Sequence, residues 1–325
     1  MTRDQHIRPL TFADTDAAHA LWNAVARYDP LSRAVFVEKV WEDDGVTPDL
    51  ALAAEVDGDL IGFAVGVVRE APVASNPATG RAGTVTRGPT MRGVVKLLAV
   101  HETYQRQGIG TALVDALEAA MVARGAAAIR LGESPPNYLH PGLDPRYTRA
   151  LLHFEKRGYE KLANAIHMDV DLTQDLDTSA DEARLLADNI TVARARPSDE
   201  SAVMAFLDAH WPAWKAEVGR TFRNDPVSLH LAWEGGGVLG FSAYDANNIG
   251  ASATGTGWFG PMGTAAAARG RGVGAVLLKR CLADMAAQGH AVSTIPWVAP
   301  VGFYAHHVGA HISRVFYRCE KQVGE

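Results

Sequence analysis

Two short stretches of this sequence decide its fold. The first is Gln105-Arg106-Gln107-Gly108-Ile109-Gly110, and the second is Arg269-Gly270-Arg271-Gly272-Val273-Gly274. Each joins an apolar run typical of a buried strand to an apolar run with helical spacing. Their offset is 269 − 105 = 164 residues, which is too long for a solenoid unit and indicates a duplicated domain.

Glycine-rich junctions of this kind suit the binding of a diphosphate. Glycine lets a ligand approach the backbone closely, and the first turn of the following helix leaves N–H groups without partners. These N–H groups and the positive end of the helix dipole attract anions, and Arg269 and Arg271 add cationic donors. The alternative is that the glycines only permit a tight turn from strand to helix. The presence of two matching copies makes this alternative less favoured.

Other nucleotide-binding motifs fit less well. Neither stretch ends in Gly-Lys-Ser/Thr, which a P-loop requires. The second stretch has the dinucleotide-binding spacing Gly270-x-Gly272-x-x-Ala275, but the next strand ends in residues 295–297 without the acid that would hold ribose. The first stretch has Leu113 at the last position and does not match.

The same order of elements surrounds each stretch. Asp57-Gly58 and the glycine run 235–237 separate apolar runs and predict hairpins. The expected strands cover residues 52–56, 60–68, 94–100, 127–131, 163–171, 229–233, 238–244, 258–264, 291–297 and 312–318. The expected helices cover residues 110–124, 150–157, 274–288 and 302–308, and residues 71–93 are expected to form a long loop. This order predicts two α/β domains, each a mixed, mostly antiparallel sheet flanked by helices.

The repeat also sets the expected domain boundaries. Residues 1–172 form the first domain and residues 190–325 the second. Residues 173–189 carry many acids and little periodic apolar pattern, so they are expected to be a linker with room for a short helix.

Composition excludes several classes of protein. The chain has 325 residues, 47% hydrophobic and 21% charged, which is typical of a globular protein. A net charge of −6 argues against nucleic acid as a partner, and no apolar run is long enough to span a membrane. The start of the sequence shows no apolar signal core, and two cysteines exclude a disulfide framework. We therefore expect a cytoplasmic monomer or homodimer.

The glycine stretches are similar to the acetyl-CoA signature of the GNAT acetyltransferase superfamily, Gln/Arg-x-x-Gly-x-Gly at a strand-to-helix junction. Residues 150–159 and 302–310 resemble the family's late helix, which ends in an aromatic residue, a glycine and a strand. The resemblance covers essentially the whole chain, once per copy, as in tandem members such as mycothiol synthase. Residues 137–144 and 259–261 also resemble a bacterial tandem subgroup linked with amino-sugar or cell-wall metabolism.

The resemblance implies an N-acetyltransferase that uses acetyl-CoA and a small-molecule amine acceptor. Strand residues would bind the pantetheine arm and polarise the thioester carbonyl, and the glycine motif would bind the diphosphate. In the first copy these residues are Leu98, Val100, Gln105, Gln107, Gly108, Ile109, Gly110 and Thr111. In the second copy they are Met262, Thr264, Arg269, Gly270, Arg271, Gly272, Val273 and Gly274.

The resemblance also predicts that the two copies differ in chemistry. In this family a tyrosine on the late helix commonly donates a proton to the leaving thiolate. The second copy has Tyr304 and the first has Phe154, so Tyr304 is the expected catalytic residue and the second copy the expected enzyme. Against this, the first copy has a longer loop after its second parallel strand. There Tyr138, His140 and Asp144 are expected to bind the acceptor, unless the loop makes an interdomain contact.

Several alternatives stay open at this stage. The general base cannot be read from the sequence, although Asp245 and His290 are candidates in the second copy. Trp211 and Trp214 could line an acceptor pocket. No metal site is expected, because the histidines near residue 306 lack the spacing of zinc ligands. The rival functions are a CoA-binding sensor without transfer and a protein lysine acetyltransferase.

Overall fold

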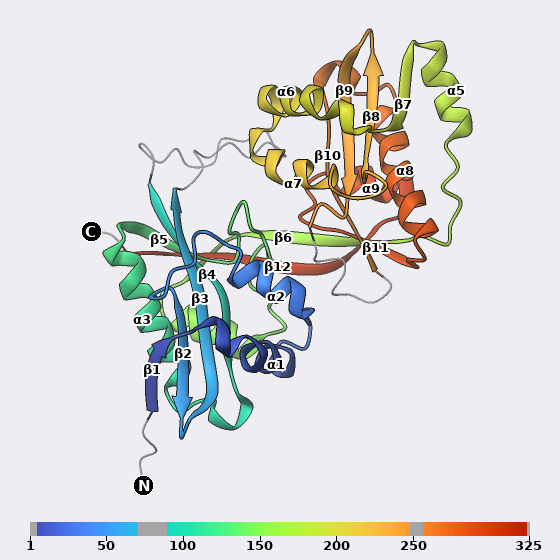
Figure 1. The fold of residues 1–325 in the computed structure, drawn as a ribbon. Coiled ribbons are helices and arrows are strands. Elements are labelled where there is room, and N and C mark those ends of the chain that lie inside the picture. The colour runs from blue at the N-terminus through green and yellow to red at the C-terminus, as the bar shows by residue number, and fades with distance from the viewer. Residues whose placement is uncertain (1–4, 71–89, 248–255, 324–325) are drawn as a thin grey trace. The chain divides into compact units, whose positions relative to one another are not determined.

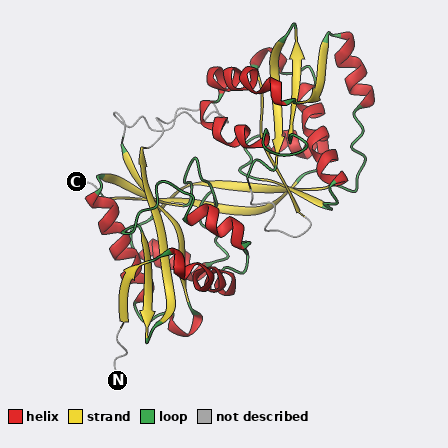
Figure 2. Ribbon diagram, viewed as in Figure 1, coloured by secondary structure: helices red, strands yellow, loops and turns green. Residues whose placement is uncertain are grey.

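The computed structural model describes residues 5–70, 90–247 and 256–323. The chain forms two compact units, each a sheet with helices packed on it (Figures 1 and 2). Unit 1 combines Met1–Ala165 with Val315–Glu325, and unit 2 consists of Ile166–Arg314. The fold is the expected mixed α/β fold.

Unit 1 has the strand order β1-β2-β3-β4-β5-β12. Neighbouring strands are antiparallel, except for the parallel pair β4 and β5. The strands are β1 (Gln5–Pro9), β2 (Ala51–Val56), β3 (Asp59–Glu70), β4 (Met91–Val100), β5 (Ala126–Leu131) and the last part of β12 (His311–Gln322). The helices are α1 (Thr15–Val25), α2 (Arg33–Val40), α3 (Ile109–Ala123) and α4 (Thr148–Lys156).

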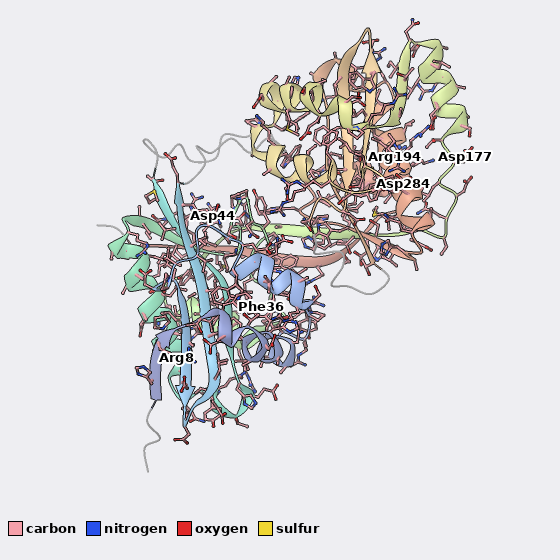
Figure 3. All side chains as sticks on the ribbon, in the orientation of Figure 1. Arg8, Phe36, Asp44, Asp177, Arg194 and Asp284 are labelled. Carbon is pink, nitrogen blue, oxygen red and sulfur yellow. The ribbon has the colours of Figure 1, made fainter. Side chains whose placement is uncertain are left out.

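Consecutive residues of β3 show how these helices cover the sheet. A Cβ on Gly62 would lie 3.2 Å from Leu113 of α3, whereas the next residue, Phe63, packs edge-on against Phe36 of α2 (Figure 3). Successive strand residues point to opposite faces of a sheet. Helix α3 therefore covers one face and α2 the other.

Unit 2 repeats this arrangement with the strand order β7-β8-β9-β10-β11-β6. Among its described strands, β10 and β11 form a parallel pair and the other neighbours are antiparallel. The strands are β7 (Ile190–Arg194), β8 (Leu229–Glu234), β9 (Gly237–Tyr244), β10 (Thr256–Thr264), β11 (Val292–Ile295) and the last part of β6 (Glu160–Asp171). The helices are α5 (Ser179–Ala187), α6 (Glu200–His210), α7 (Lys215–Thr221), α8 (Val273–Ala287) and α9 (Val301–Val308).

A half-buried ion pair ties α8 to the edge of this sheet. Arg194 of β7 lies 2.7 Å from Asp284 of α8, and the two labelled side chains meet in Figure 3. His230 of β8 contacts the other carboxylate oxygen of Asp284 at 2.6 Å. Burial raises the pKa of Asp284, but the contacts with His230 and Arg194 outweigh this and hold it below its usual value. The pair is thus charged and fixes the helix on the strands.

Both expected hairpins form, and they use the same turn. Asp57 and Gly58 both have positive φ, 54° and 89°, and Gly235 and Gly236 have φ of 57° and 81°. Two consecutive residues with positive φ make a type I′ turn, whose twist matches that of the strands. This confirms the hairpins predicted from Asp-Gly and from the glycine run.

The duplication is visible in how the long helices touch the sheet. A Cβ on Gly93 would lie 2.6 Å from the sulfur of Met121, and a Cβ on Gly257 would lie 2.5 Å from the sulfur of Met285. Both pairs keep the offset of 164 residues. Glycine is needed in each strand because a methionine of the helix occupies the space of its side chain.

The structure corrects the expected partners of the two long late strands. Residues 163–171 were expected to close the first copy and residues 312–318 the second. Instead β6 pairs with β11 of unit 2 through Met168–Asp171, and β12 pairs with β5 of unit 1 through Glu320–Gln322. Each unit thus takes one strand from the other half of the sequence.

The compact units also differ from the boundaries expected at residues 172 and 190. The expected linker, residues 173–189, contains helix α5, which belongs to unit 2 and packs near β7. Most of the expected loop 71–93 lies outside the described residues, but Met91–Gly93 is part of β4. Among the helices of the described residues, none is both long and apolar enough to cross a membrane.

Candidate active site

The parallel strands of unit 1 separate next to the glycine-rich turn. The pairing of β4 with β5 ends at Val95 and Leu131, where the Gly132 N–H donates to the Val95 carbonyl at 3.0 Å. Strand β4 continues to Val100 in its pairing with β3. Leu98 and Val100 therefore lie beyond the end of β5, on the part of β4 expected to receive a pantetheine arm.

Unit 2 shows the same separation. The pairing of β10 with β11 ends at Trp258 and Thr294, and β10 continues to Thr264 along β9. Met262 and Thr264 lie in this extension, after a register shift that follows Phe259. In both copies the parallel pair thus ends before the strand that leads to the glycine motif does.

The glycine motif forms an open cradle in unit 1. Gly108 is the residue before α3 and has a φ of +89°, a conformation that favours glycine. Ile109, Gly110 and Thr111 form the first turn of α3, whose N–H groups have no acceptor within the helix. A Cβ on Gly108 would meet no atom within 4 Å, and a Cβ on Gly110 would meet only Val100, at 3.7 Å. An anion can therefore approach these N–H groups closely.

The side chains of this motif brace the turn. The Gln105 amide donates to the Val100 carbonyl at 2.9 Å and accepts from Arg149 of α4 at 2.8 Å. The Gln107 amide donates to the Thr103 carbonyl at 2.8 Å. These contacts hold the loop, and the expected role of Gln105 and Gln107 in binding the cofactor stays a prediction.

In unit 2 an exposed arginine side chain lies beside the corresponding glycine. Gly272 is the residue before α8 and has a φ of +85°, but a Cβ there would lie 2.5 Å from the guanidinium of Arg184. Arg184 of α5 also donates to the Arg271 carbonyl at 3.2 Å. The Arg271 side chain, expected to bind phosphate, forms an ion pair with Glu234 at 2.7 Å, which raises the pKa of Arg271. Two more residues were expected to bind the cofactor, Arg269 and Gly270. They lie in the turn before α8, where Gly270 has a φ of +74°.

Two aromatic side chains fill further space in unit 2. A Cβ on Gly274 would lie 3.4 Å from the ring of Phe303, and Val273 beside it is buried. A Cβ on Gly263 of β10 would lie 2.8 Å from the indole of Trp211. Trp211 stacks on Trp214 at 5.6 Å between ring centres. Trp211 thus packs on the extension of β10, rather than lining an open acceptor pocket there.

Tyr304 lies in the core of unit 2. Its ring packs edge-on against Phe259 and Phe303, and burial raises the pKa of its hydroxyl. Phe154 is its counterpart in unit 1, because each accepts a backbone hydrogen bond from the residue after the helix-ending glycine, Tyr159 in unit 1 and Ala310 in unit 2. The role of Tyr304 as a proton donor stays a prediction.

The candidate bases of the second copy lie near each other. Burial raises the pKa of the Asp245 carboxyl, and the charge of His290 opposes that rise. Asp245 also has a φ of +48° and donates its N–H to the Trp258 carbonyl at the end of the paired part of β10. Their role as bases stays a prediction.

The three residues expected to bind the acceptor have different surroundings in unit 1. Tyr138 is half-buried, and Asp144 is buried and accepts from the Arg146 guanidinium at 2.6 Å. His140 instead lies with its Nδ1 3.6 Å from the carboxylate of Asp29. The structure thus brings His140 to an acidic partner more than 100 residues away, which sequence spacing did not reveal.

A buried charged cluster lies where α2 packs on the sheet of unit 1, and it was not expected from the sequence. The ammonium of Lys96, on β4 just beyond the last pair with β5, bonds to the Asp43 carboxylate and to the Lys39 carbonyl at 2.7 Å. Burial lowers the pKa of Lys96 to about 8, against the opposing charge of Asp43. The Asp43 carboxylate also contacts Arg69. A lysine within the apolar run 94–100 was the available signal.

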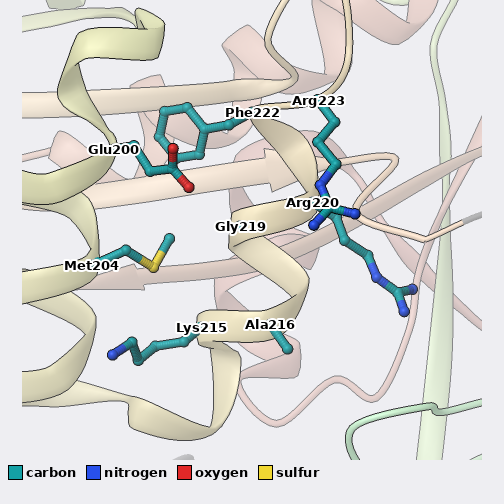
Figure 4. A pocket seen from close by; sticks show the side chains of 8 residues that line it. All are labelled: Glu200, Met204, Lys215, Ala216, Gly219, Arg220, Phe222 and Arg223. Carbon is teal, nitrogen blue, oxygen red and sulfur yellow. The ribbon is translucent and has the colours of Figure 1, made fainter.

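An open pocket of about 460 Å³ lies on α6 and α7 of unit 2 (Figure 4). Its charged lining residues are Glu200, Lys215, Arg220 and Arg223. It does not include the glycine motif. Among the described residues, no three His, Cys, Asp or Glu side chains come together as a group that could hold a metal ion.

Comparison with known proteins agrees with this geometry. The model of the acetyltransferase (GNAT) family matches residues 16–138 and again residues 193–309. The matches cover most of the chain, so this chain belongs to the GNAT acetyltransferase family, as an acyltransferase with two tandem GNAT domains. No curated protein sequence matches it.

Several solved structures share the fold. A GCN5-related glucosamine N-acetyltransferase region of a fungal multi-domain GH3 β-N-acetylglucosaminidase has a TM-score of 0.80 at 20% identity, over 98% of this chain and 38% of that chain. This chain therefore spans well under half of that protein. A GCN5-related N-acetyltransferase from Sphaerobacter thermophilus has a TM-score of 0.66 at 19% identity, covering 99% of this chain and 96% of that one. A tandem GNAT protein from the clavulanic acid biosynthesis pathway has a TM-score of 0.65 at 15% identity, covering 99% of both chains.

Proposed function

We propose that this protein is an acetyl-CoA-dependent N-acetyltransferase for a small-molecule primary amine, and that transfer takes place in unit 1. Acetyl-CoA supplies an acetyl group activated as a thioester. The N–H groups of Ile109, Gly110 and Thr111 bind the diphosphate, and the extension of β4 from Lys96 to Val100 binds the pantetheine arm and polarises the carbonyl.

The observation that carries the choice of unit is the contrast between the two cradles. Gly108 and Gly110 are open, whereas Arg184 lies against Gly272 and Phe303 against Gly274. A diphosphate at the start of α8 would meet the Arg184 guanidinium, which donates to the Arg271 carbonyl, and this side chain would have to change its position to admit the ligand. Unit 1 needs no such rearrangement, and exposed Arg106 and Arg149 lie on or beside its turn as cationic partners.

An amino sugar is the first acceptor to test. The glucosamine N-acetyltransferase region that shares the fold supports this class, and the loop with His140 and Asp144 offers polar groups for a polar acceptor. The free, buried thiols of Cys281 and Cys319 are in keeping with a reducing cytoplasm.

A second candidate is transfer in unit 2 through Tyr304. The observation in its favour is that Tyr304 has a hydroxyl at the place where unit 1 has Phe154. In this candidate the exposed Arg184 guanidinium either moves aside for the diphosphate or binds it. Arg184→Ala separates the two cases, because it strengthens acetyl-CoA binding in the first and weakens it in the second. Binding of acetyl-CoA without transfer to any amine would instead indicate a sensor, and transfer only to peptide lysines a protein acetyltransferase.

The test combines calorimetry with an assay of thiol release. We expect one acetyl-CoA per chain, lost in Gly108→Glu and kept in Gly272→Glu, because an acid in an occupied cradle clashes with and repels the diphosphate. Release of CoA thiol with glucosamine and other primary amines then measures transfer. Loss of binding only in Gly272→Glu would contradict the assignment to unit 1, and no binding in the unmodified protein would contradict the function.

A further inference from the structure

Charged side chains gather on three neighbouring strands of unit 1, β4, β5 and β12. The Arg130 guanidinium lies between two carboxylates, with its Nε 2.6 Å from Glu320 and its Nη1 2.7 Å from Glu133. The Nε of Arg318 lies 2.5 Å from the other carboxylate oxygen of Glu133, and the Nε of Arg92 lies 3.4 Å from Glu320. Three guanidiniums thus share two carboxylates, and the group has one positive charge in excess. We call these five residues the arginine cluster.

The charge of this cluster is incompletely balanced at Arg92. The Nε of Arg92 is buried and makes no hydrogen bond within the described part of the chain. Both oxygens of Glu320 already accept from other side chains, Oε1 from Gln322 at 2.9 Å and Oε2 from Arg130. Burial lowers the pKa of Arg92, and the positive charge of Arg130 lowers it further. A bound anion would relieve this repulsion between partly buried charges of the same sign.

The arginine cluster lies beside the place where β4 and β5 separate. The pairing of these strands ends at Leu131, and Glu133 follows two residues later. Arg92 lies next to Gly93, whose added Cβ would contact Met121 of α3. Successive strand residues point to opposite faces of a sheet, so Arg92 points away from α3. The start of α3 binds the diphosphate in the proposed function, and a ligand of Arg92 then lies on the other face of the sheet.

The loop predicted to bind the acceptor runs directly beside Arg318. Leu143 of this loop and Tyr317 exchange two backbone hydrogen bonds, of 2.9 and 2.7 Å. An added Cβ on Gly142 would lie 3.3 Å from the backbone nitrogen of Arg318. The Glu133 N–H donates to another carbonyl of the same loop at 2.8 Å. Glu133 thus holds both the loop and the Arg318 guanidinium. The Arg318 side chain is 30% exposed, so a ligand can reach it.

We propose that Arg92 and Arg318 bind an anionic group of the acceptor, a phosphate or a carboxylate, an inference that rests on transfer in unit 1. The terminal nitrogens of a guanidinium match two oxygens of either anion. One bound negative charge neutralises the excess charge of the arginine cluster. The acceptor is then an amine that also carries an anion, such as an amino sugar with a phosphate or a carboxylate, rather than glucosamine itself.

The test compares three acceptors: glucosamine, glucosamine 6-phosphate, and muramic acid, a glucosamine that carries a carboxylate. In the unmodified protein, kcat/KM with an anionic acceptor should exceed that with glucosamine about 10-fold or more. Arg318→Gln should lower kcat/KM with the anionic acceptor about 10- to 100-fold, mainly by raising KM. It should leave kcat/KM with glucosamine and the Kd for acetyl-CoA unchanged. Calorimetry with the two anionic compounds in the presence of CoA measures binding without turnover.

Arg8→Gln is the matched control. The Arg8 side chain is 28% exposed, close to the exposure of Arg318, and its Nε also binds a glutamate, Glu55, at 2.6 Å. It lies on β1, at the opposite end of the strand order of unit 1 from β12. Arg8→Gln therefore removes the same charge from the protein without changing the arginine cluster, and it should behave as the unmodified protein with all three acceptors.

Distinct outcomes separate this inference from the proposed function. Equal losses with glucosamine and with the anionic acceptors in Arg318→Gln would show a structural role alone and overturn the inference. A kcat/KM with glucosamine that equals or exceeds both others, or no calorimetric binding of either anionic compound, would also overturn it. A preference for one anionic acceptor supports the inference and identifies the anion. If Arg318→Gln does not fold, Arg92→Gln provides the same comparison. A wild-type protein that binds no acetyl-CoA overturns the proposed function itself.

Discussion

Replacing Gly108 by alanine tests the acetyl-CoA cradle with a very small perturbation. Gly108 has a φ of +89°, and a Cβ there would meet no atom within 4 Å. The change therefore adds backbone strain without a clash. A left-handed conformation costs an ordinary residue about 1–2 kcal/mol. If the turn relaxes to relieve this strain, the N–H groups of α3 move, and acetyl-CoA binding should weaken about 5- to 30-fold.

The chain offers a matched control in the hairpin between β2 and β3. Gly58 also has a φ of +89° and also has no atom within 4 Å of a built Cβ. Gly58→Ala should therefore cost the same ~1–2 kcal/mol of stability, which for a unit of this size lowers Tm by about 2–8 °C. It should leave acetyl-CoA binding unchanged, because the hairpin turn is not part of the cradle.

The assay is calorimetric titration with acetyl-CoA, paired with thermal unfolding of each variant. We expect similar losses of Tm in Gly58→Ala and Gly108→Ala, with weaker binding only in Gly108→Ala. If Gly108→Ala loses Tm but binds acetyl-CoA as tightly as the unmodified protein, the strain does not move the N–H groups of α3 and the reasoning is refuted. If Gly58→Ala weakens binding equally, strain acts through overall stability and the reasoning fails.

Two further predictions concern buried side chains. Burial lowers the pKa of Lys96 from 10.5 to about 8 despite the opposing Asp43 charge, so between these pH values the unfolded chain binds more protons than the folded one. The unfolding free energy of the unmodified protein should therefore rise relative to that of Lys96→Met, by ~3 kcal/mol between pH 8 and 10.5. Urea unfolding of both proteins at several pH values measures this difference. A difference that does not change with pH would contradict the prediction. Tyr304→Phe should keep full turnover if transfer occurs in unit 1. The Tyr304 hydroxyl makes no hydrogen bond with a described residue, so its loss should not disturb the fold. A 100-fold loss of kcat would instead support Tyr304 as the acid.

The sequence by itself determined the local elements and the duplication. Asp57-Gly58 fixed a hairpin because both residues tolerate positive φ, and the glycine motifs fixed a strand-to-helix turn for the same reason. The helices after Gly108 and Gly272 followed from apolar spacing. These features depend on neighbours within a few residues, so they can be read without a structure.

Only the tertiary structure decided which groups from distant parts of the chain meet. No local pattern indicated that β6 pairs with β11 or that β12 pairs with β5, because the apolar pattern of a strand does not specify its partner. Nor did the sequence reveal that Arg184 lies beside Gly272 or that Asp29 faces His140. Matching motifs thus differ in their surroundings, which depend on long-range packing that local patterns do not encode.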